Sequence, residues 1–126
     1  MSNEQTETIA RRLVALCREG KFSQAHDELY APGARSIEVE GNSTGPLGNV
    51  EGLDAIRAKG REFDQSYEQV HSLAVSEPLI AGRFFTCTMT IDATWKGRGR
   101  SAMDEICVYE TAGGKIVREQ FFYGMD

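Results

Sequence analysis

The sequence gives no sign of a metal or nucleotide site. Its two histidines, His26 and His71, fall in different predicted elements and lack the spacing of metal ligands. The glycine-rich stretch 41–52 fits neither of the common nucleotide-binding fingerprints. We therefore expect no metal and no cofactor.

Clustered positive charge and long apolar runs are also missing. The formal net charge is −5, and the densest basic run, Lys96-Gly-Arg-Gly-Arg100, is short and typical of a hairpin loop. Nucleic acid is therefore not an expected partner, because phosphates need a cationic surface. No apolar run approaches the roughly 20 residues that span a bilayer. The first residues lack the basic start and apolar core of a secretion signal. We expect no membrane association and a cytoplasmic location.

The three cysteines are an odd number without metal-ligand spacing. Cys17 falls on the apolar stripe of a predicted helix, and Cys87 and Cys107 fall within predicted strands. Free cysteine commonly packs as a small hydrophobic side chain, and reducing compartments disfavour disulfides. We predict three structural thiols. Cys87 or Cys107 as a nucleophile is the alternative.

The length of 126 residues suits a single domain over residues 1–126. Ile9, Leu13 and Leu16 recur at helical spacing, and Gly20 stands where that helix should end. A short helix capped by Ser23 is predicted to reach Tyr30, and Pro32-Gly33 breaks this helix. Further on, the pattern predicts a strand, a loop, a helix and four strands over 35–40, 41–48, 52–65, 67–76, 79–95, 98–110 and 115–123. Helices followed by strands indicate an α+β fold with an antiparallel sheet.

The last third of the sequence predicts a β-hairpin. Segments 101–110 and 115–123 alternate in polarity around the turn Thr111-Ala-Gly-Gly114. If Glu110 pairs with Lys115, one face carries the opposed pairs Val108/Val117, Ile106/Glu119, Asp104/Phe121 and Ala102/Tyr123. Glu105 and Arg118 then form an ordinary ion pair on the other face. Carboxylates on a mainly apolar face are costly unless they are paired or functional. We interpret the first face as the wall of a ligand pocket.

The neighbouring strands extend that wall. Alternate residues Phe85, Cys87, Met89, Ile91 and Ala93 are predicted to face inwards, and a row of threonines to face outwards. A flat threonine-rich face suits pairing with the same face of a second copy, so a homodimer through the sheet is expected. His71 shares a face with Leu73 and Val75. It is predicted to enter the pocket, with a hydrogen-bonded core histidine as the alternative.

The predicted hairpin resembles the closing hairpin of SnoaL-like proteins, in the runs Met103-Asp-Glu-Ile-Cys-Val-Tyr and Gly114-Lys-Ile-Val-Arg-Glu-Gln-Phe-Phe-Tyr123. With the two N-terminal helices and the segment Leu29-Tyr-Ala-Pro-Gly-Ala34, the resemblance covers nearly the whole chain. It implies the superfamily of nuclear transport factor 2, ketosteroid isomerase, limonene epoxide hydrolase and the SnoaL polyketide cyclases. The implied fold is a cone-shaped, strongly curved antiparallel (mixed) sheet wrapped around N-terminal helices. The fold does not imply one function, because it carries isomerases, hydrolases, cyclases and non-catalytic binders alike.

The resemblance to ketosteroid isomerase also suggests site residues. It places Glu38 near that enzyme's general-base aspartate. If the register slips by one, Ile37 or Val39 takes the inner place, and Glu40, with the same strand parity as Glu38, is the fallback candidate. The isomerase's hydrogen-bond-donating aspartic acid corresponds to Ile106, and Asp104 lies two residues earlier on the same predicted face. Tyr30 is expected near the pocket mouth.

The candidate catalytic groups are therefore the carboxyls of Asp104, Glu119 and Glu38, with Tyr123 or His71 as hydrogen-bond donors. In an apolar cavity, desolvation and a second carboxyl raise a carboxyl pKa, so one group can hold a proton while another stays ionised. This favours a cofactor-free isomerase-, cyclase- or dehydratase-like enzyme acting on a small hydrophobic carbonyl compound. The predicted ligand-binding residues are Tyr30, His71, Tyr123, Phe121, Ile106, Phe85 and Met89.

Two other functions remain open. The protein would be a non-catalytic small-molecule binder or dimerising module if its acids are structural, for example if Glu119 pairs with Arg118 or Arg83. An epoxide-hydrolase-like enzyme would need an arginine turned inwards between two acids. We rank that function third, since nothing in the spacing indicates it.

Overall fold

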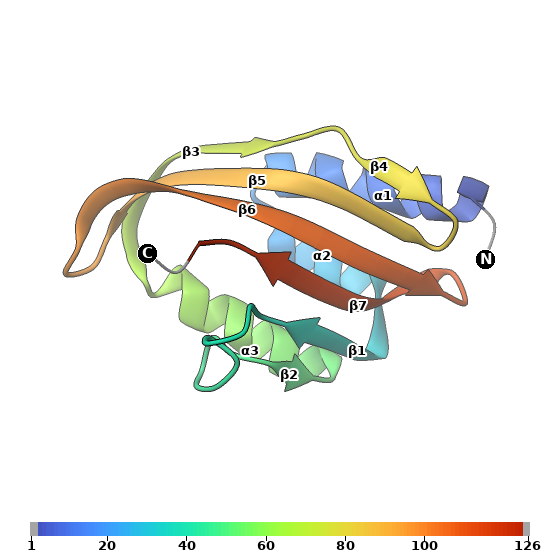
Figure 1. Cartoon of the computed structure of the whole chain (residues 1–126), viewed down its shortest axis with the longest axis horizontal. Coiled ribbons are helices and arrows are strands. Elements are labelled where there is room, and N and C mark those ends of the chain that lie inside the picture. The colour runs from blue at the N-terminus through green and yellow to red at the C-terminus, as the bar shows by residue number, and fades with distance from the viewer. Residues whose placement is uncertain (1–2, 125–126) are drawn as a thin grey trace.

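A strongly curved, unclosed sheet forms the body of the computed structural model, which describes residues 3–124 (Figure 1). The helices are α1 (Asn3–Arg18), α2 (Phe22–Leu29) and α3 (Leu53–Asp64). The strands are β1 (Tyr30–Ile37), β2 (Val50–Glu51), β3 (Tyr67–Val75), β4 (Leu79–Ala81), β5 (Phe84–Trp95), β6 (Gly99–Ala112) and β7 (Lys115–Phe122). The sheet order is β2-β1-β7-β6-β5-β3, with β4 beside β5. The predicted α+β class, with a curved mixed sheet around N-terminal helices, is confirmed.

Strand β1 makes the sheet mixed, because it lies parallel to β7 whereas the other strand pairs are antiparallel. This pairing joins the first third of the chain to its last strand. Helices α1 and α2 pack on one side of the sheet, and α3 lies beside β1 and β2 (Figure 1). No helix within residues 3–124 is long and apolar enough to cross a membrane.

Helix α1 ends as its sequence predicts. Its buried stripe includes Ile9, Leu13 and Leu16, which pack into the main core. Gly20 follows with a positive φ of 72°. The Gly20 N–H donates to the Cys17 carbonyl, and the Lys21 N–H donates to the Leu16 carbonyl. This pair of bonds is a Schellman motif, in which glycine takes the left-handed position.

Two predicted boundaries nearby are wrong. Helix α2 begins at Phe22, before the proposed cap Ser23, because the turn after α1 lets the Lys21 carbonyl accept the Ala25 N–H. Strand β1 begins at Tyr30, directly after α2, and not at residue 35, so Pro32-Gly33 lies inside the strand. The β1–β7 register shifts between Tyr30 and Arg35, and such an irregular segment tolerates a residue that lacks an N–H.

The alternation predicted for β5 is confirmed. Phe85, Cys87, Met89, Ile91 and Ala93 are all buried on the inner face of the sheet. The predicted single strand over 79–95 is divided, however. Gly82, with a φ of 61°, turns the chain between β4 and β5, so the two strands form a hairpin.

The register predicted for the last hairpin is wrong. Ala112, not Glu110, lies opposite Lys115, because Gly113 and Gly114 both adopt positive φ and form a two-residue turn. The register then shifts, so that Thr111 pairs with Ile116 but Glu110 pairs with Arg118. Because of this bulge, the residues of β7 after Ile116 lie opposite different residues of β6 from those predicted, and odd-numbered residues of both strands share one face. The inner face of β6 therefore carries the odd-numbered residues, including Glu105, whereas Asp104 and Ile106 point outwards.

We expect the turn at Gly113 to be sensitive to substitution. Gly113→Val should lower the free energy of unfolding by about 1–2 kcal/mol, because a β-branched residue is strained at positive φ. Urea unfolding followed by circular dichroism measures the change. Gly113→Asn is the matched control, since asparagine tolerates this region. Equal stability of the valine and asparagine variants would contradict the turn described here.

Candidate active site

Four ionisable side chains meet on the inner face of the sheet. Glu38 follows β1, Lys59 comes from α3, Glu105 from β6 and Glu119 from β7. Lys59 binds Glu38 directly and is linked to Glu119 through Ser36, and the charges of all three act on the pKa of Glu105. We call them the carboxylate cluster. It holds three carboxyl groups and one ammonium in a largely apolar interior.

Glu119 is the most deeply buried member, with 5% of its surface exposed. The Tyr30 hydroxyl donates to its Oε1, and the Ser36 hydroxyl donates to its Oε2 at 2.6 Å. Burial raises the pKa of Glu119, whereas the two hydrogen bonds and Lys59 act against that rise. Because both oxygens are held by buried side chains, Glu119 fixes β7 against β1.

Lys59 is the single cation of the cluster. Its Nζ lies 2.6 Å from Glu38 Oε2 and 2.8 Å from Ser36 Oγ. The exposed fractions of the Lys59 and Glu38 side chains are 11% and 8%. The ammonium also lies 5.6 Å from the centre of the Phe121 ring. This ion pair is therefore largely removed from water, and its partners satisfy the charge of Lys59 inside the protein.

The loop between β1 and β2 holds Glu38 from two points. The Asn42 Nδ2 donates to the Tyr123 hydroxyl at 2.5 Å, and that hydroxyl donates to Glu38 Oε1 at 2.5 Å. The Asn49 Oδ1 accepts the backbone N–H of Glu38 at 2.7 Å. Burial and the bond to Glu38 raise the pKa of Tyr123 to about 12. The phenol therefore stays protonated at neutral pH and can donate.

Glu105 faces inwards but keeps part of its surface exposed. Burial raises its pKa to about 7, and a weak hydrogen bond from the Cys107 thiol, at 3.6 Å, acts in the opposite direction. Phe121 and Tyr123 are also half-buried on this face. A carboxyl group with this pKa is partly protonated at neutral pH, so it can both accept and release a proton.

The structure brings together some of the predicted site residues. Glu119, Glu38, Tyr30 and Tyr123 belong to one hydrogen-bonded network, and Phe121 lies beside Lys59. Phe85 and Met89 are buried in the core on the inner face of β5.

Three other predicted residues lie elsewhere. Asp104 is exposed on the outer face, where the Thr90 hydroxyl donates to it at 2.6 Å. Ile106, also on the outer face, is 49% exposed. The inward placement of both is therefore wrong, because the predicted register assigned β6 the opposite parity. His71 lies at an irregularity of β3, with its Nε2 2.7 Å from Thr94 Oγ1, and it makes no described contact with the cluster.

Sequence reasoning missed Glu105, Lys59 and Ser36. For Glu105 a signal was present: Met89 was correctly placed inside, and the β5–β6 register sets Glu105 directly opposite Met89. Lys59 lies three residues after Ile56 and four before Phe63, on the core-facing stripe of α3. A lysine on such a stripe is a visible anomaly, but its partner Glu38 depends on tertiary structure.

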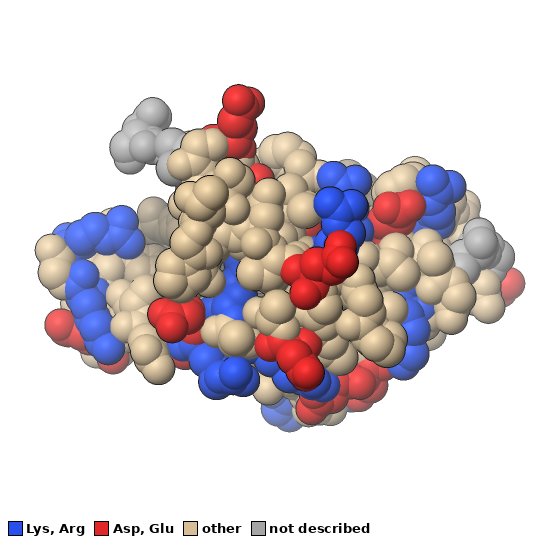
Figure 2. Space-filling model, turned by 90° about the horizontal axis from the view of Figure 1, so that it is seen from below, with Lys and Arg blue, Asp and Glu red and all other residues tan. Residues whose placement is uncertain are grey.

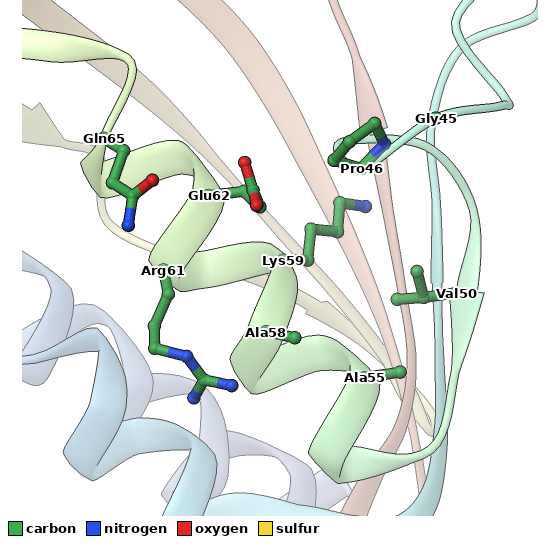
Figure 3. A pocket seen from close by; sticks show the side chains of 9 residues that line it. All are labelled: Gly45, Pro46, Val50, Ala55, Ala58, Lys59, Arg61, Glu62 and Gln65. Atoms are coloured by element: carbon green, nitrogen blue, oxygen red, sulfur yellow. The ribbon is translucent and has the colours of Figure 1, made fainter.

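Lys59 also lines an open groove between α3 and the 41–49 loop (Figure 3). The groove has a volume of about 430 Å³ and is lined by Gly45, Pro46, Val50, Ala55, Ala58, Lys59, Arg61, Glu62 and Gln65. Figure 3 shows the Lys59 side chain extending from α3 beneath Pro46. The stem of Lys59 thus belongs to the groove, while its ammonium belongs to the carboxylate cluster.

The charged surface around the groove is mixed. Figure 2 shows basic and acidic side chains interspersed on the underside of the molecule. Several of them form exposed ion pairs, such as Arg57 with Asp27 at 2.6 Å. This face therefore carries no broad patch of one sign. Among residues 3–124, no group of histidine, cysteine, aspartate or glutamate side chains has an arrangement that could hold a metal ion.

Comparison with known proteins assigns the fold to a family. Residues 4–123 match the model of the SnoaL-like domain. A Mesorhizobium loti protein, proposed to be a SnoaL-like polyketide cyclase, is 30% identical with a TM-score of 0.83, over 92% of this chain and 97% of that one. A nuclear-transport-factor-2-like protein of unknown function from Burkholderia pseudomallei is 19% identical with a TM-score of 0.79, over 98% and 92% of the two chains.

A third structure contains a small molecule. It is a Catenulispora acidiphila protein with a ketosteroid-isomerase-like fold, in complex with trimethylamine. It is 19% identical with a TM-score of 0.71, over 93% of this chain and 85% of that one. None of the curated proteins compared with the chain matches it.

The buried ion pair predicts a large, coupled effect on stability. Lys59→Met should lower the free energy of unfolding by about 3 kcal/mol, because it leaves the Glu38 carboxylate buried without its cation. Adding Glu38→Gln should recover part of the loss, which urea unfolding of both single variants and the double variant will measure. Arg100→Met is the control, since it breaks the more exposed Arg100–Asp92 pair and should cost less than about 1 kcal/mol. Additive effects of the two cluster substitutions would contradict the coupling.

Glu105 predicts a specific dependence of stability on pH. Its folded-state pKa is raised from 4.5 to about 7, so its stabilising contribution is complete below pH 4.5 and is lost as pH rises through 7. The free energy of unfolding of Glu105→Gln, relative to that of wild type, should therefore rise by about 2 kcal/mol from pH 5 to pH 9. Urea unfolding across that range measures this difference. Asp104→Asn removes a carboxylate from the outer face of the same strand and controls for charge alone. Parallel curves for wild type and Glu105→Gln would refute the burial of this group.

Proposed function

We propose, from the premise that this chain belongs to the SnoaL-like family, that it binds a small hydrophobic carbonyl compound and acts on it by cofactor-free acid–base chemistry. The observation that carries the proposal is Glu105, a carboxyl group with a pKa of about 7 that keeps exposed surface on the inner face. General acid–base catalysis is most effective when the pKa of the group lies near the working pH. The trimethylamine complex of a relative supports the binding of small molecules by this fold.

We infer a role for each member of the cluster. The Glu105 carboxylate would remove a proton from the carbon next to the carbonyl group, and the electrons of that C–H bond would move to the carbonyl oxygen. The ammonium of Lys59 would stabilise the resulting oxyanion electrostatically. In a compound with a carbon–carbon double bond next to that carbon, the oxyanion would then collapse to the carbonyl group, the double bond would shift into conjugation, and protonated Glu105 would return the proton to the far end of the original double bond, which completes an isomerisation. Glu119 would hold Tyr30 and Ser36 in place without touching the compound.

Proton abstraction can be tested before the natural substrate is known. Wild-type protein in D₂O should exchange the methyl hydrogens of acetophenone for deuterium, with a rate that rises as pH passes through about 7, because the carboxylate is the active form. Glu105→Gln should lower the rate by about a hundredfold, measured by proton NMR. Asp104→Asn, on the outer face of the same strand, should keep the wild-type rate. Binding without exchange in all three proteins would favour the non-catalytic binder.

We also propose a homodimer that forms through the outer face of the sheet. Ile106 and Phe122 lie directly opposite each other on that face, with 49% and 43% of their surfaces exposed. The outer-facing threonines of β5 extend the same face. The proposed location is the cytoplasm, which three free, buried cysteines support.

The dimer can be tested by introducing charge on that face. Ile106→Glu should convert a dimer into a monomer in sedimentation velocity, because a buried carboxylate without a partner is costly. Phe22→Glu, at a residue 37% exposed on α2 and away from the outer face of the sheet, is the control and should leave the assembly intact. A wild-type monomer, or an Ile106→Glu dimer, would exclude this interface.

A further inference from the structure

Lys59 differs from the three other lysines of the chain. Lys21, Lys96 and Lys115 are exposed, whereas the Lys59 side chain is 11% exposed and reaches into the interior. It stands on the core-facing side of α3, between Ile56 and Phe63. An ammonium in this position is costly unless its environment compensates for lost hydration. Solubility, the usual role of a surface lysine, therefore does not explain a lysine at this position.

Lys59, Glu38 and Tyr123 form a chain of three hydrogen-bonded groups. The Lys59 Nζ lies 2.6 Å from Glu38 Oε2, and the other oxygen of Glu38 accepts the Tyr123 hydroxyl at 2.5 Å. Asn42 donates to the same hydroxyl, which directs the phenolic hydrogen towards Glu38. Covalent catalysis requires a nucleophile within hydrogen-bond reach of a base that a third group orients. Lys59, Glu38 and Tyr123 meet these three requirements.

The Lys59 side chain also borders a groove that is open to a small molecule. Its stem lines the groove between α3 and the 41–49 loop, and its ammonium lies 5.6 Å from the half-buried Phe121 ring. The groove wall near Lys59 includes the apolar residues Pro46 and Val50 (Figure 3). These surroundings fit a compact compound with an apolar body and an electrophilic carbonyl carbon.

We propose that Lys59 forms a reversible imine with a small apolar aldehyde or ketone. Glu38 takes one proton from the ammonium, and the free electron pair of Nζ attacks the carbonyl carbon. The carbonyl oxygen takes the second proton that Nζ loses, which gives a neutral carbinolamine. The hydroxyl group of this intermediate then leaves as water, taking from Glu38, directly or through the Tyr123 hydroxyl, the proton first removed from the ammonium. The product is a protonated C=N bond at Nζ, and hydrolysis reverses each step without an oxidant or reductant.

This inference rests on the proposed function in one respect, since both place a carbonyl compound at the carboxylate cluster. It adds a covalent step that acid–base chemistry at Glu105 does not require. A protonated imine would withdraw electrons from the carbon framework more strongly than a neutral carbonyl group. Lys59 would then act as a nucleophile, whereas the proposed function alone needs only its positive charge.

The experiment uses wild-type protein, benzaldehyde and sodium cyanoborohydride, followed by digestion and mass spectrometry of each lysine. Benzaldehyde has no hydrogen on the carbon next to its carbonyl group, so it reports imine formation and not proton abstraction. Lys59 should be labelled about a hundredfold faster than Lys21, Lys96 and Lys115, which is the acceleration expected from a positioned acid–base group. The three exposed lysines are internal controls that do not depend on any variant folding.

Two variants complete the test. Glu38→Gln should slow labelling of Lys59 by about a hundredfold and leave the exposed lysines unchanged, because the base is lost. Asp104→Asn should leave all four rates unchanged. Labelling of Lys59 at or below the rate of the exposed lysines would overturn the inference. If acetophenone still exchanges its hydrogens in that case, the proposed function stands without the covalent step; if neither reaction occurs, both fail.

Discussion

The ion pair between Lys59 and Glu38 is the contact on which the described site depends. One ammonium faces three carboxyl groups in a largely apolar interior, and it is the one positively charged member of the cluster that offsets them. Through Ser36 it is linked to Glu119, and through Glu38 it is linked to Tyr123. Removing the cation would therefore affect residues of β1, β7 and the 41–49 loop together. Such a network is costly when only part of it is satisfied, and rigid when it is complete.

The distribution of protons follows from this arrangement. Glu38 accepts hydrogen bonds from an ammonium and a phenol. Among the residues that the structure describes, the Cys107 thiol is the hydrogen-bond partner of Glu105, and burial raises the pKa of Glu105 to about 7. The two carboxyl groups thus differ in their partners, and Glu105 can gain or lose a proton near neutral pH. This difference makes the inner face suited to moving protons.

The sequence predicted those parts of the fold that local rules determine. The helical spacing of Ile9, Leu13 and Leu16, the stop at Gly20 and the alternation of β5 all depend on residues near each other in the chain. The family resemblance supplied the curved sheet. The predicted register of the last hairpin is wrong because the hairpin combines a two-residue turn with a bulge after Ile116. Because the bulge adds one residue to β7, the alternation of polarity alone does not predict which face of the sheet each later residue of β7 lies on.

The same failure explains which site residues were found. Glu119 was predicted to face inwards and does, but Asp104 was chosen in place of Glu105 because the predicted parity of β6 was reversed. Lys59 escaped notice because a single polar residue within a helical pattern does not reveal its partner. Glu38 lies 21 residues away, and only the packing of α3 against β1 brings the two together.

The contacts of the cluster also have a consequence for how the chain folds. Tyr30 meets Glu119 across 89 residues, Ser36 meets it across 83, and Glu38 meets Tyr123 across 85. Contacts of such large sequence separation have a high entropic cost of loop closure, and this cost slows folding to the native state. The cluster cannot assemble before β1 has docked beside β7, which joins strands from opposite ends of the chain. The chemical groups of the site are therefore brought together only when the sheet itself is complete.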